Sequence, residues 1–251
     1  MENIRNRVDV RLVTSRKMAS KLSVKPNFQH CTIFDENLVA IHMRKTALQF
    51  NKPVYLGMCI LDLSKTLMYD FHHNYIRPKY VQKAKLLYTD TDSLIYEIET
   101  KDFFKDISSD VKQKFDTSDY PKEHPSGIPT GVNKKVLGMF KDEASGEIIQ
   151  EFVGLRAKMY SFRMLEQDEH KRCKGIRKNI VKETITHEDF KQCLFGGGEQ
   201  YRTMNVIRSY RHKLYSEEVN KIALSADDDK RVIMGDEITT LAYGHYKLNE
   251  Q

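Results

Sequence analysis

The stretch that constrains the fold most strongly runs from residue 86 to residue 98 and reads LLYTDTDSLIYEI. Its two ends, residues 86–88 and 94–98, are rich in the aliphatic and aromatic residues that favour β-strands. Residues 90–93 between them read DTDS, and these residue types are typical of a tight turn. The sequence therefore predicts a β-hairpin whose tip is polar and acidic.

Two aspartates, Asp90 and Asp92, lie two positions apart at this tip. Side chains two positions apart on an extended strand point to the same side, so we expect both carboxylates to face one point. Mg²⁺ prefers carboxylate oxygens and keeps waters and substrate phosphates as its other ligands. The tip therefore indicates a Mg²⁺ site for a nucleotide, and an ordinary polar turn is the alternative. An EF-hand loop is excluded, because its sixth and twelfth positions would be Ile95 and Lys101 in place of Gly and Glu.

Helix-like and strand-like segments alternate along the rest of the chain. A long helix is expected after Pro53, because apolar residues recur there at helical spacing and predict a stripe that belongs to the core. The stripe consists of Leu56, Cys59, Ile60, Leu63, Leu67 and Phe71. Further helices are predicted at 16–23, 101–115 and 186–195, strands at 8–15, 28–33, 37–43, 45–49 and 147–165, and a loop at 116–135. This mixed pattern indicates an α+β fold in which an antiparallel sheet packs against helices.

The net charge of the chain is +6, and it is unevenly distributed. Residues 153–215 contain fourteen Lys or Arg and seven Asp or Glu, whereas the remainder is close to neutral. A basic half beside a neutral half predicts a polyanionic partner, most simply nucleic acid. A solvated basic surface is the alternative.

The four cysteines, Cys31, Cys59, Cys173 and Cys193, show no paired spacing. They predict free thiols in a reducing compartment, the nucleus or the cytoplasm. No apolar run approaches the ~20 residues needed to span a bilayer. The first residues also lack the layout of a secretory signal. The sequence therefore predicts an intracellular protein without a membrane partner.

A second motif, Lys158 and Tyr160, lies in the strand-like segment LRAKMYSF. The spacing predicts that both side chains share one strand face, with a cation beside an aromatic ring. Such a pair suits a phosphate and an adjacent sugar or base. The basic run KRCKGIRK follows, and its cations are expected to contact a nucleic-acid backbone, with a solvated loop as the alternative: Lys171, Arg172, Lys174, Arg177 and Lys178.

The string YTDTDSLIY resembles the Tyr-x-Asp-Thr-Asp-Ser signature of family B DNA polymerases, and Lys158-Met159-Tyr160 resembles their KxY motif. Together with GMFKDE, CKGIRK and TLAYGHY, the wider sequence looks like the protein-primed type found in viruses and virus-like transposons. The resemblance covers essentially the whole chain. It implies a post-fingers segment and β-rich insertion at residues 1–50, a palm at 51–180, and a small thumb-like C-terminal region at 181–251.

The resemblance also implies a chemistry, the two-metal transfer of a nucleotide to a primer 3′-hydroxyl with Mg²⁺ as the cofactor. Asp92 would be a principal catalytic metal ligand, and Asp90 would be a supporting carboxylate. Nucleotide or primer binding would involve Tyr88, Thr91, Ser93, Lys158 and Tyr160. The implied partners are primer–template DNA, a dNTP, and the N-terminal portion of the polymerase or a terminal protein.

Two motifs of the family are absent from this sequence. One is an upstream D-x-x-S-L-Y-P-like string, which supplies another metal-binding aspartate. The other is the fingers motif K-x-x-x-N-x-x-Y-G, whose lysine neutralises triphosphate charge. Since MENIRNRVDVR looks like the sequence that follows the fingers motif, Met1 would correspond to an internal position. We therefore expect a C-terminal palm and thumb fragment with little or no polymerase activity by itself.

Two other functions are compatible with parts of the pattern. One is a non-catalytic remnant that keeps a basic nucleic-acid-binding surface without the chemistry. The other is a Mg²⁺-dependent glycosyltransferase with a DxD motif. That reading requires a nucleotide-binding βαβ region upstream of the aspartates, which the sequence does not show.

Overall fold

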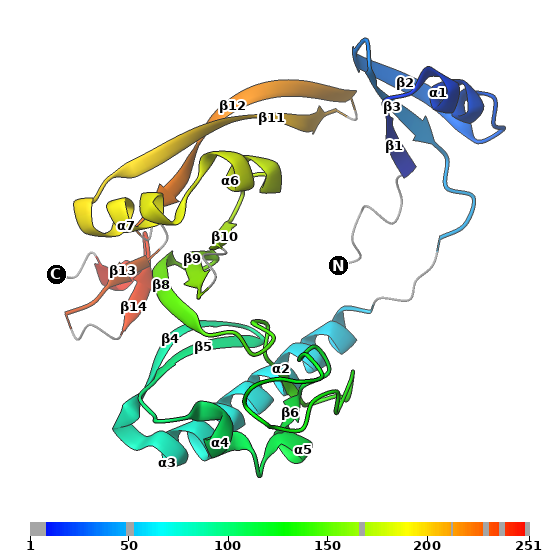
Figure 1. Cartoon of the computed structure of the whole chain (residues 1–251). Helices are drawn as coiled ribbons and strands as arrows, with labels where there is room; N and C mark the ends of the chain where they lie inside the picture. Colours follow the sequence, from blue (N-terminus) through cyan, green and yellow to red (C-terminus); the bar gives the residue numbers. More distant parts are fainter. Residues whose placement is uncertain are drawn as a thin grey trace. The chain divides into compact units, whose positions relative to one another are not determined.

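A computed structural model of the chain describes residues 9–48, 53–165, 169–211, 213–227, 231–235 and 239–248. The chain is mixed α+β with several small antiparallel sheets, as the sequence predicts (Figure 1). Within these residues the strands are β1 (Asp9–Val13), β2 (Phe28–Asp35), β3 (Leu38–Met43), β4 (Ala84–Asp90), β5 (Ser93–Ile98), β6 (Phe115–Asp116), β7 (Phe140–Lys141), β8 (Ile149–Arg156), β9 (Met159–Met164), β10 (Glu169–Cys173), β11 (Glu199–Tyr210), β12 (Lys213–Ser225), β13 (Arg231–Ile233) and β14 (Thr240–Ala242). The helices described there are α1 (Arg16–Ser23), α2 (Val54–Asp70), α3 (Arg77–Tyr80), α4 (Phe103–Ile107), α5 (Val111–Lys114), α6 (Lys178–Thr184) and α7 (His187–Gly196), with a π-helical segment at Phe71–Ile76 and short 3-10 turns at Val81–Lys83 and Tyr246–Leu248.

The chain forms two compact units, and each combines segments that are distant in the sequence. The first unit contains Met1–Thr66 and Asn205–Val219, and the second contains Leu67–Met204 and Asn220–Gln251. The boundaries fall inside α2 and inside the β11–β12 hairpin. The regions expected from the family resemblance, 1–50, 51–180 and 181–251, stay predictions, and residues 1–8 and 49–52 lie outside the described part.

The N-terminal sheet has the order β1-β3-β2, and α1 packs on it. Its core consists of Val13, Leu22, Ile41 and Met43. The predicted strand at 45–49 is wrong for residues 45–48, and residue 49 lies outside the described part. The strand pairing ends at Phe28 and Met43, and beyond it the Arg44 N–H makes one further bond in the same register, to the Asn27 carbonyl at 2.7 Å.

Helix α2 begins after Pro53 as predicted, but most of its apolar stripe is not core. Leu56, Ile60 and Leu63 are 53%, 65% and 70% exposed, whereas Phe71, just beyond the helix, is buried. Helical spacing shows which side chains share a face, and it does not show whether another surface covers that face. The expectation that the whole stripe is core is therefore wrong.

Residues 84–98 form the predicted hairpin, β4 paired with β5, which we call the aspartate hairpin. Phe71, Ile76 and Tyr80 form a buried cluster, and apolar residues of the hairpin pack against it. The cluster anchors the base of the hairpin to the helical segment that precedes it. The tip, with its aspartates, lies at the opposite end of the two strands.

Residues 101–115 form two short helices, α4 and α5, where one helix is predicted. Asp102 caps α4 by accepting from the Lys105 N–H at 3.1 Å, and the Ser108 hydroxyl donates to the Lys105 carbonyl at 2.9 Å. Short polar side chains that bond the nearby backbone compete with helix continuation. The Ser-Ser-Asp sequence at 108–110 therefore interrupts the helix.

The long loop that precedes β7 is held by two polar side chains. The Asn133 amide donates to the carbonyls of Lys112 and Phe115 at 3.0 and 2.9 Å. The Asp142 carboxylate accepts from the Ala144 N–H at 2.8 Å and from the Tyr120 hydroxyl at 2.8 Å. These bonds give a segment without regular structure a defined course.

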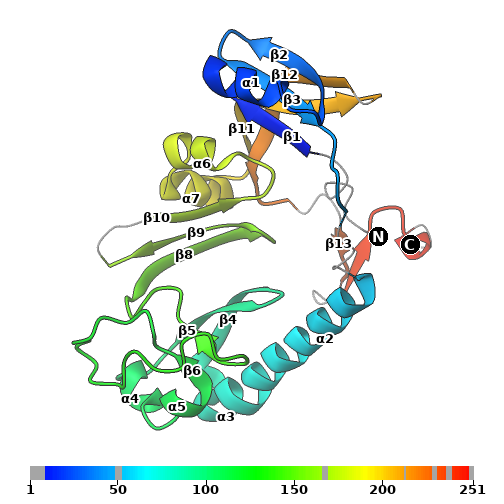
Figure 2. The same cartoon turned by 90° about the vertical axis from the view of Figure 1, so that its right-hand side faces the viewer.

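A three-stranded antiparallel sheet in the order β10-β9-β8 forms the centre of the second unit. Helices α6 and α7 lie on one side of this sheet (Figure 2). On that side the Ser161 hydroxyl and the His187 Nδ1 are 2.9 Å apart, and both residues are buried. Glu151 lies 3.2 Å from the His187 Nε2 and also pairs with Arg163 and Lys191. Helix α7 is thus fixed to the sheet by a partly buried polar network as well as by apolar contacts.

The C-terminal region contains a long β-hairpin. β11 and β12 are 12 and 13 residues long and pair with each other. β11 follows two glycines in the left-handed region, Gly197 and Gly198, with φ of +69° and +91°. These glycines end α7, because glycine adopts the left-handed backbone without a steric cost.

The four cysteines are unpaired thiols, two of them exposed and two buried. Burial raises the pKa of the Cys173 thiol to about 11. Among the described residues, no helix has the length and apolar character required to cross a membrane.

We predict that Phe190→Ala destabilises the protein by about 3–5 kcal/mol, because the Phe190 ring on α7 is completely buried and its removal leaves a cavity. Urea unfolding followed by circular dichroism measures the change. Phe195→Ala, on the same helix at an 82% exposed position, is the matched control and should stay within about 0.5 kcal/mol of the wild type. Equal losses in both variants would contradict the described packing of α7.

Candidate functional site

The tip of the aspartate hairpin is a two-residue turn between Asp90 and Ser93. Thr91 has a φ of +51°, in the left-handed region, and the Asp92 N–H donates to the Asp90 carbonyl at 2.5 Å. The Ser93 hydroxyl donates to the same carbonyl at 3.1 Å. The two aspartates are therefore not on one extended strand, and the alternation from which we expected them to face one point does not apply.

Lys158 connects this tip to the central sheet. Its ammonium donates to the Asp90 carboxylate, and its backbone N–H donates to the Tyr88 hydroxyl at 3.1 Å. Lys158 and Asp90 are 68 positions apart in the sequence. Side chain and backbone of one residue thus fasten the aspartate hairpin to the β8–β9 turn.

The position of Lys158 differs from the sequence prediction. It lies in the turn between β8 and β9 with a φ of +62°, whereas Tyr160 lies on β9 itself. The two residues therefore do not share a face of one extended strand. They still line one pocket, because the turn directs the lysine toward Asp90.

Electrostatic coupling is strongest between Asp90 and Lys158. The hydrogen bond from Lys158 lowers the pKa of the Asp90 carboxyl, and the same bond raises the pKa of Lys158. The charges of Tyr88 and Asp92 contribute smaller increases to the pKa of Lys158. Burial raises the pKa of the Tyr88 hydroxyl. At neutral pH the site therefore contains an ionised pair beside a neutral phenol.

A pocket of about 530 Å³ opens beside this ion pair. Among the described residues, its lining contains six Lys or Arg and two acidic side chains, so the pocket is strongly basic. The lining residues are Tyr88, Asp90, Lys158, Tyr160, Glu169, Lys171, Arg172, Cys173, Lys174, Ile176, Lys178, Val181 and Lys182. We call this feature the basic pocket.

The structure places most of the sequence-predicted site residues at this pocket. Arg172, Lys174 and Lys178 line it with exposed side chains. Asp92 and Thr91 are exposed at the hairpin tip and are not among the described residues that line it. The Thr91 hydroxyl donates to the Asp90 carboxylate at 3.2 Å, so both Thr91 and Ser93 hold Asp90 in place. Arg177 occupies the N-cap position of α6.

Lys171 has a different environment from the other predicted cations. Its side chain is 13% exposed, and its ammonium donates to the Ile185 carbonyl at 2.6 Å and pairs with Glu169 at 3.2 Å. Glu169 also accepts from the His187 N–H at 3.2 Å. Lys171 is thus tied to the start of α7 and supports the wall of the pocket.

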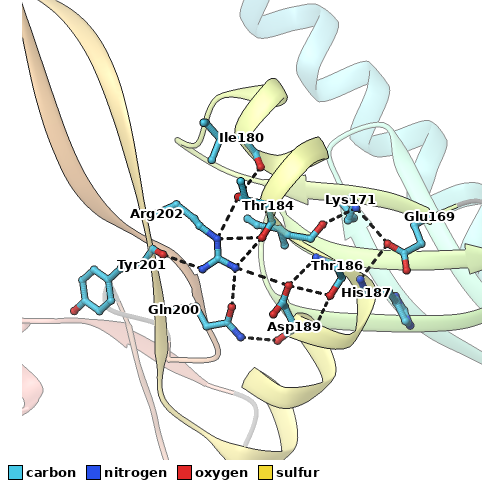
Figure 3. A network of polar contacts seen from close by, with 11 residues as sticks. Glu169, Lys171, Ile180, Thr184, Thr186, His187, Asp189, Gln200, Tyr201 and Arg202 are labelled. Atoms are coloured by element: carbon cyan, nitrogen blue, oxygen red, sulfur yellow. Dashed lines mark hydrogen bonds and ion pairs between the residues drawn. The ribbon is translucent and has the colours of Figure 1, made fainter.

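Figure 3 shows the polar network behind this wall. The Thr186 hydroxyl accepts from the Asp189 N–H at 3.2 Å, and the Asp189 carboxylate accepts from the Thr186 N–H at 2.7 Å, which forms a capping box at the start of α7. Arg202 on β11 donates to the Thr184 carbonyl at 2.9 Å and to the Gln200 side chain at 3.2 Å. The junction between α6 and α7 is therefore held from two directions.

Two lining residues, Lys182 and Glu169, are not among the sequence-predicted site residues. Lys182 lies on α6 four positions after Lys178, and residues four apart share a helix face. This spacing is a signal from which Lys182 could have been predicted. Glu169 had no comparable signal, because its role depends on the register of β10 beside β9.

The tip has few ligands for a metal ion. Within the ranges described, no group of three or more His, Cys, Asp or Glu side chains is placed to hold one. One Mg²⁺ can be held by one or two carboxylates when substrate phosphates and waters supply the rest. Asp90 and Asp92 therefore fit at most one such ion together with a bound phosphate, and they do not provide the ligands for two ions.

Comparisons with known proteins give no relative for this chain. No protein-family model matches it, and searches of curated proteins and of solved structures return no match. A functional assignment therefore depends on the geometry of the basic pocket and on the sequence motifs.

We predict that Lys158→Met raises the pKa of the Asp90 carboxyl toward its ordinary value of 3.8. The ammonium stabilises the ionised carboxylate, so its removal makes protonation easier. Because the pKa of Asp90 is lowered in the folded protein, the pair stabilises the fold above the ordinary value, and this stabilisation is lost as the pH falls through the folded-state pKa. NMR titration of the carboxyl carbon measures the shift.

The matched control is Lys182→Met, which removes a cation from the same pocket without touching Asp90. It should leave the Asp90 pKa unchanged. An Asp90 pKa that is the same in Lys158→Met and in the wild type would contradict the ion pair.

Proposed function

We propose that this chain is a palm-containing C-terminal portion of a family B DNA polymerase of the protein-primed type. Its basic pocket would receive the primer–template backbone beside the aspartate tip. The tip would contribute carboxylates to the Mg²⁺ site at which a dNTP reacts with the primer 3′-hydroxyl.

One observation carries the proposal: two motifs that resemble parts of one polymerase site meet in space. Asp90 of the YTDTDS string and Lys158 of the KxY string are 68 positions apart in the sequence and form an ion pair. Tyr88 and Tyr160, from the same two strings, have ring centroids 4.6 Å apart. An accidental match of two short strings would not require these residues to lie together.

The pocket suits a nucleic-acid backbone. Phosphate oxygens are recognised by Lys and Arg side chains, and a cationic surface retains a polyanion by releasing its counterions. Within the described part of the chain, the structure shows no carboxylate partner for four of the lining cations, Arg172, Lys174, Lys178 and Lys182. These four side chains are the ones we assign to the phosphates.

The aspartate tip suits the metal-binding part of nucleotidyl transfer. A Mg²⁺ ion held there would neutralise phosphate charge and orient the reacting groups. In this structure the Lys158 ammonium donates to the Asp90 carboxylate, which is therefore not free to bind a metal ion. A bound phosphate offers the lysine an alternative partner, so phosphate binding and release of Asp90 would occur together.

A second function, a nucleic-acid-binding remnant without catalysis, is favoured by one feature. Asp90 and Asp92 are the carboxylates at the tip, and polymerisation with two ions needs more of them. This remnant keeps the basic pocket and predicts DNA binding that does not depend on the aspartates. The two functions therefore differ in whether Mg²⁺ and a dNTP bind at the tip.

We predict that the double variant Lys178→Gln/Lys182→Gln binds primed DNA more weakly and with a smaller salt dependence. Each lost phosphate contact reduces the slope of log affinity against log salt by about one. Fluorescence anisotropy over a series of salt concentrations measures this slope. Lys65→Gln, at an exposed position on α2, is the control and should leave the slope unchanged. An unchanged slope in the double variant would show that the basic pocket is not part of the DNA-binding surface.

We predict that the purified chain incorporates little or no labelled dNTP on a primed template, because its tip provides the ligands for one metal ion at most. Mg²⁺-dependent dNTP binding that is lost in Asp90→Asn/Asp92→Asn, while DNA binding persists, would support the polymerase assignment. Absence of that dNTP binding in the wild type would favour the remnant. Robust incorporation that Asp92→Ala abolishes would show that the expected inactivity is wrong.

A further inference from the structure

Four aromatic rings form a continuous row from the edge of the central sheet to the aspartate hairpin. His170 and Phe162 are stacked with centroids 4.7 Å apart and planes 7° apart. Phe162 and Tyr160 follow at 6.3 Å and 10°, and Tyr88 ends the row as a tilted ring, 4.6 Å from Tyr160 with planes 50° apart. We call these four residues the aromatic ladder.

The strand register explains why the rings align. Phe162 pairs with His170 on β10, and Tyr160 pairs with Arg172, so these four side chains emerge on one face of the sheet. Tyr88 extends the row from β4. The register thus places three rings and a guanidinium in two adjacent cross-strand pairs.

Gly154 has no side chain, and this allows the Phe152 ring to lie beside the ladder. It pairs with Tyr160 on the neighbouring strand β8. A Cβ atom at this position would lie 3.0 Å from the Phe152 ring, which closes on the strand where a side chain would otherwise stand. Phe152 in turn lies 6.0 Å from Tyr160, so a fifth ring supports the ladder from the side.

The ladder lies on the face of the sheet opposite to the helices. Ser161, between Tyr160 and Phe162 on the same strand, is completely buried and bonded to His187 on α7. Its two neighbours therefore point away from α7. Tyr160 and Phe162 are partly exposed and His170 is exposed, as expected for side chains at a binding face rather than in a core.

The charges around the ladder favour one class of partner. Arg172 is the cross-strand neighbour of Tyr160, and Lys158 precedes Tyr160 by two positions. Both cations line the basic pocket together with Tyr160 and Tyr88, so this end of the ladder adjoins the phosphate-binding side chains, and Phe162 and His170 continue the row beyond the pocket lining. A partner with regularly spaced anions and flat apolar groups matches this combination of cations and the three near-parallel rings of Tyr160, Phe162 and His170.

We propose that the aromatic ladder is a stacking platform for the unpaired bases of single-stranded DNA, whose backbone lies along the cations of the basic pocket. Base–aromatic stacking is tolerant of sequence, since every base has a π-face. The inference rests on the DNA-binding part of the proposed function. It adds Phe162 and His170 as binding residues and single-stranded DNA as the form of the ligand.

The test uses the full chain with a tryptophan at the ladder. The chain contains no tryptophan, so Phe162→Trp introduces a single reporter whose emission is quenched when a base stacks on it. Oligo(dT) should quench this emission, whereas inorganic polyphosphate, a polyanion without bases, should not. The matched control is Phe195→Trp, at an exposed position on α7, which should bind oligo(dT) with equal affinity and show no quenching.

Affinity provides a second measurement that does not depend on the reporter. His170→Ala alters an exposed residue and should leave the fold intact, and it should weaken oligo(dT) binding about fivefold or more. The same variant should bind blunt duplex DNA as the wild type does, because paired bases are not free to stack.

Three results would overturn the inference. They are equal quenching of the Phe162 and Phe195 reporters, unchanged oligo(dT) affinity in His170→Ala, and tighter binding of oligo(rU) than of oligo(dT). These results are distinct from a failure of the proposed function. If oligo(dT) quenches the Phe162→Trp variant but the chain shows no Mg²⁺-dependent dNTP binding, the stacking inference is supported and the polymerase assignment is wrong.

Discussion

The double attachment of Lys158 to the aspartate hairpin is the constraint on which the site depends. Its ammonium bonds the Asp90 carboxylate, and its N–H bonds the Tyr88 hydroxyl at 3.1 Å. Side chain and backbone act at two points on one strand, so the hairpin cannot swing about a single contact. Asp90, the rings of Tyr88 and Tyr160 and the cations of β10 are thereby brought to one pocket.

The pocket has a fixed wall and an adaptable rim. Lys171 has a side chain only 13% exposed, and it is joined to the start of α7 through the Ile185 carbonyl and through Glu169, so its bonds are costly to leave unmade. Arg172, Lys174 and Lys178 are exposed on the rim, where long side chains can move to meet a ligand. The proposed binding of a DNA strand relies on this arrangement of exposed cations on a fixed frame.

Local features of this fold could be predicted from the sequence, and contacts between distant segments could not. The DTDS turn, the start of α2 after Pro53 and the break at Gly197 follow from residues next to one another. The exposure of Leu63 does not, because periodicity contains no information about a covering surface. The sequence of the basic run also does not show that Lys171 is shielded and Lys178 exposed, because this difference depends on where Glu169 and the Ile185 carbonyl lie. For the site, the two motifs supplied Tyr88, Asp90, Lys158 and Tyr160, which line one pocket, whereas the direct bond between Asp90 and Lys158 required the structure.

The left-handed backbone at Lys158 limits which amino acids can replace it. At a φ of +62°, a β-branched side chain would crowd the neighbouring carbonyl, so Val, Ile or Thr would strain the turn in addition to removing the charge. Unbranched residues, or Asn and Gly, would change the chemistry with less disturbance of the chain. Natural variation at this position should therefore be narrow for two independent reasons, one conformational and one electrostatic. A loss of function in a variant with a β-branched residue there would not show whether the strained backbone or the lost charge is the cause.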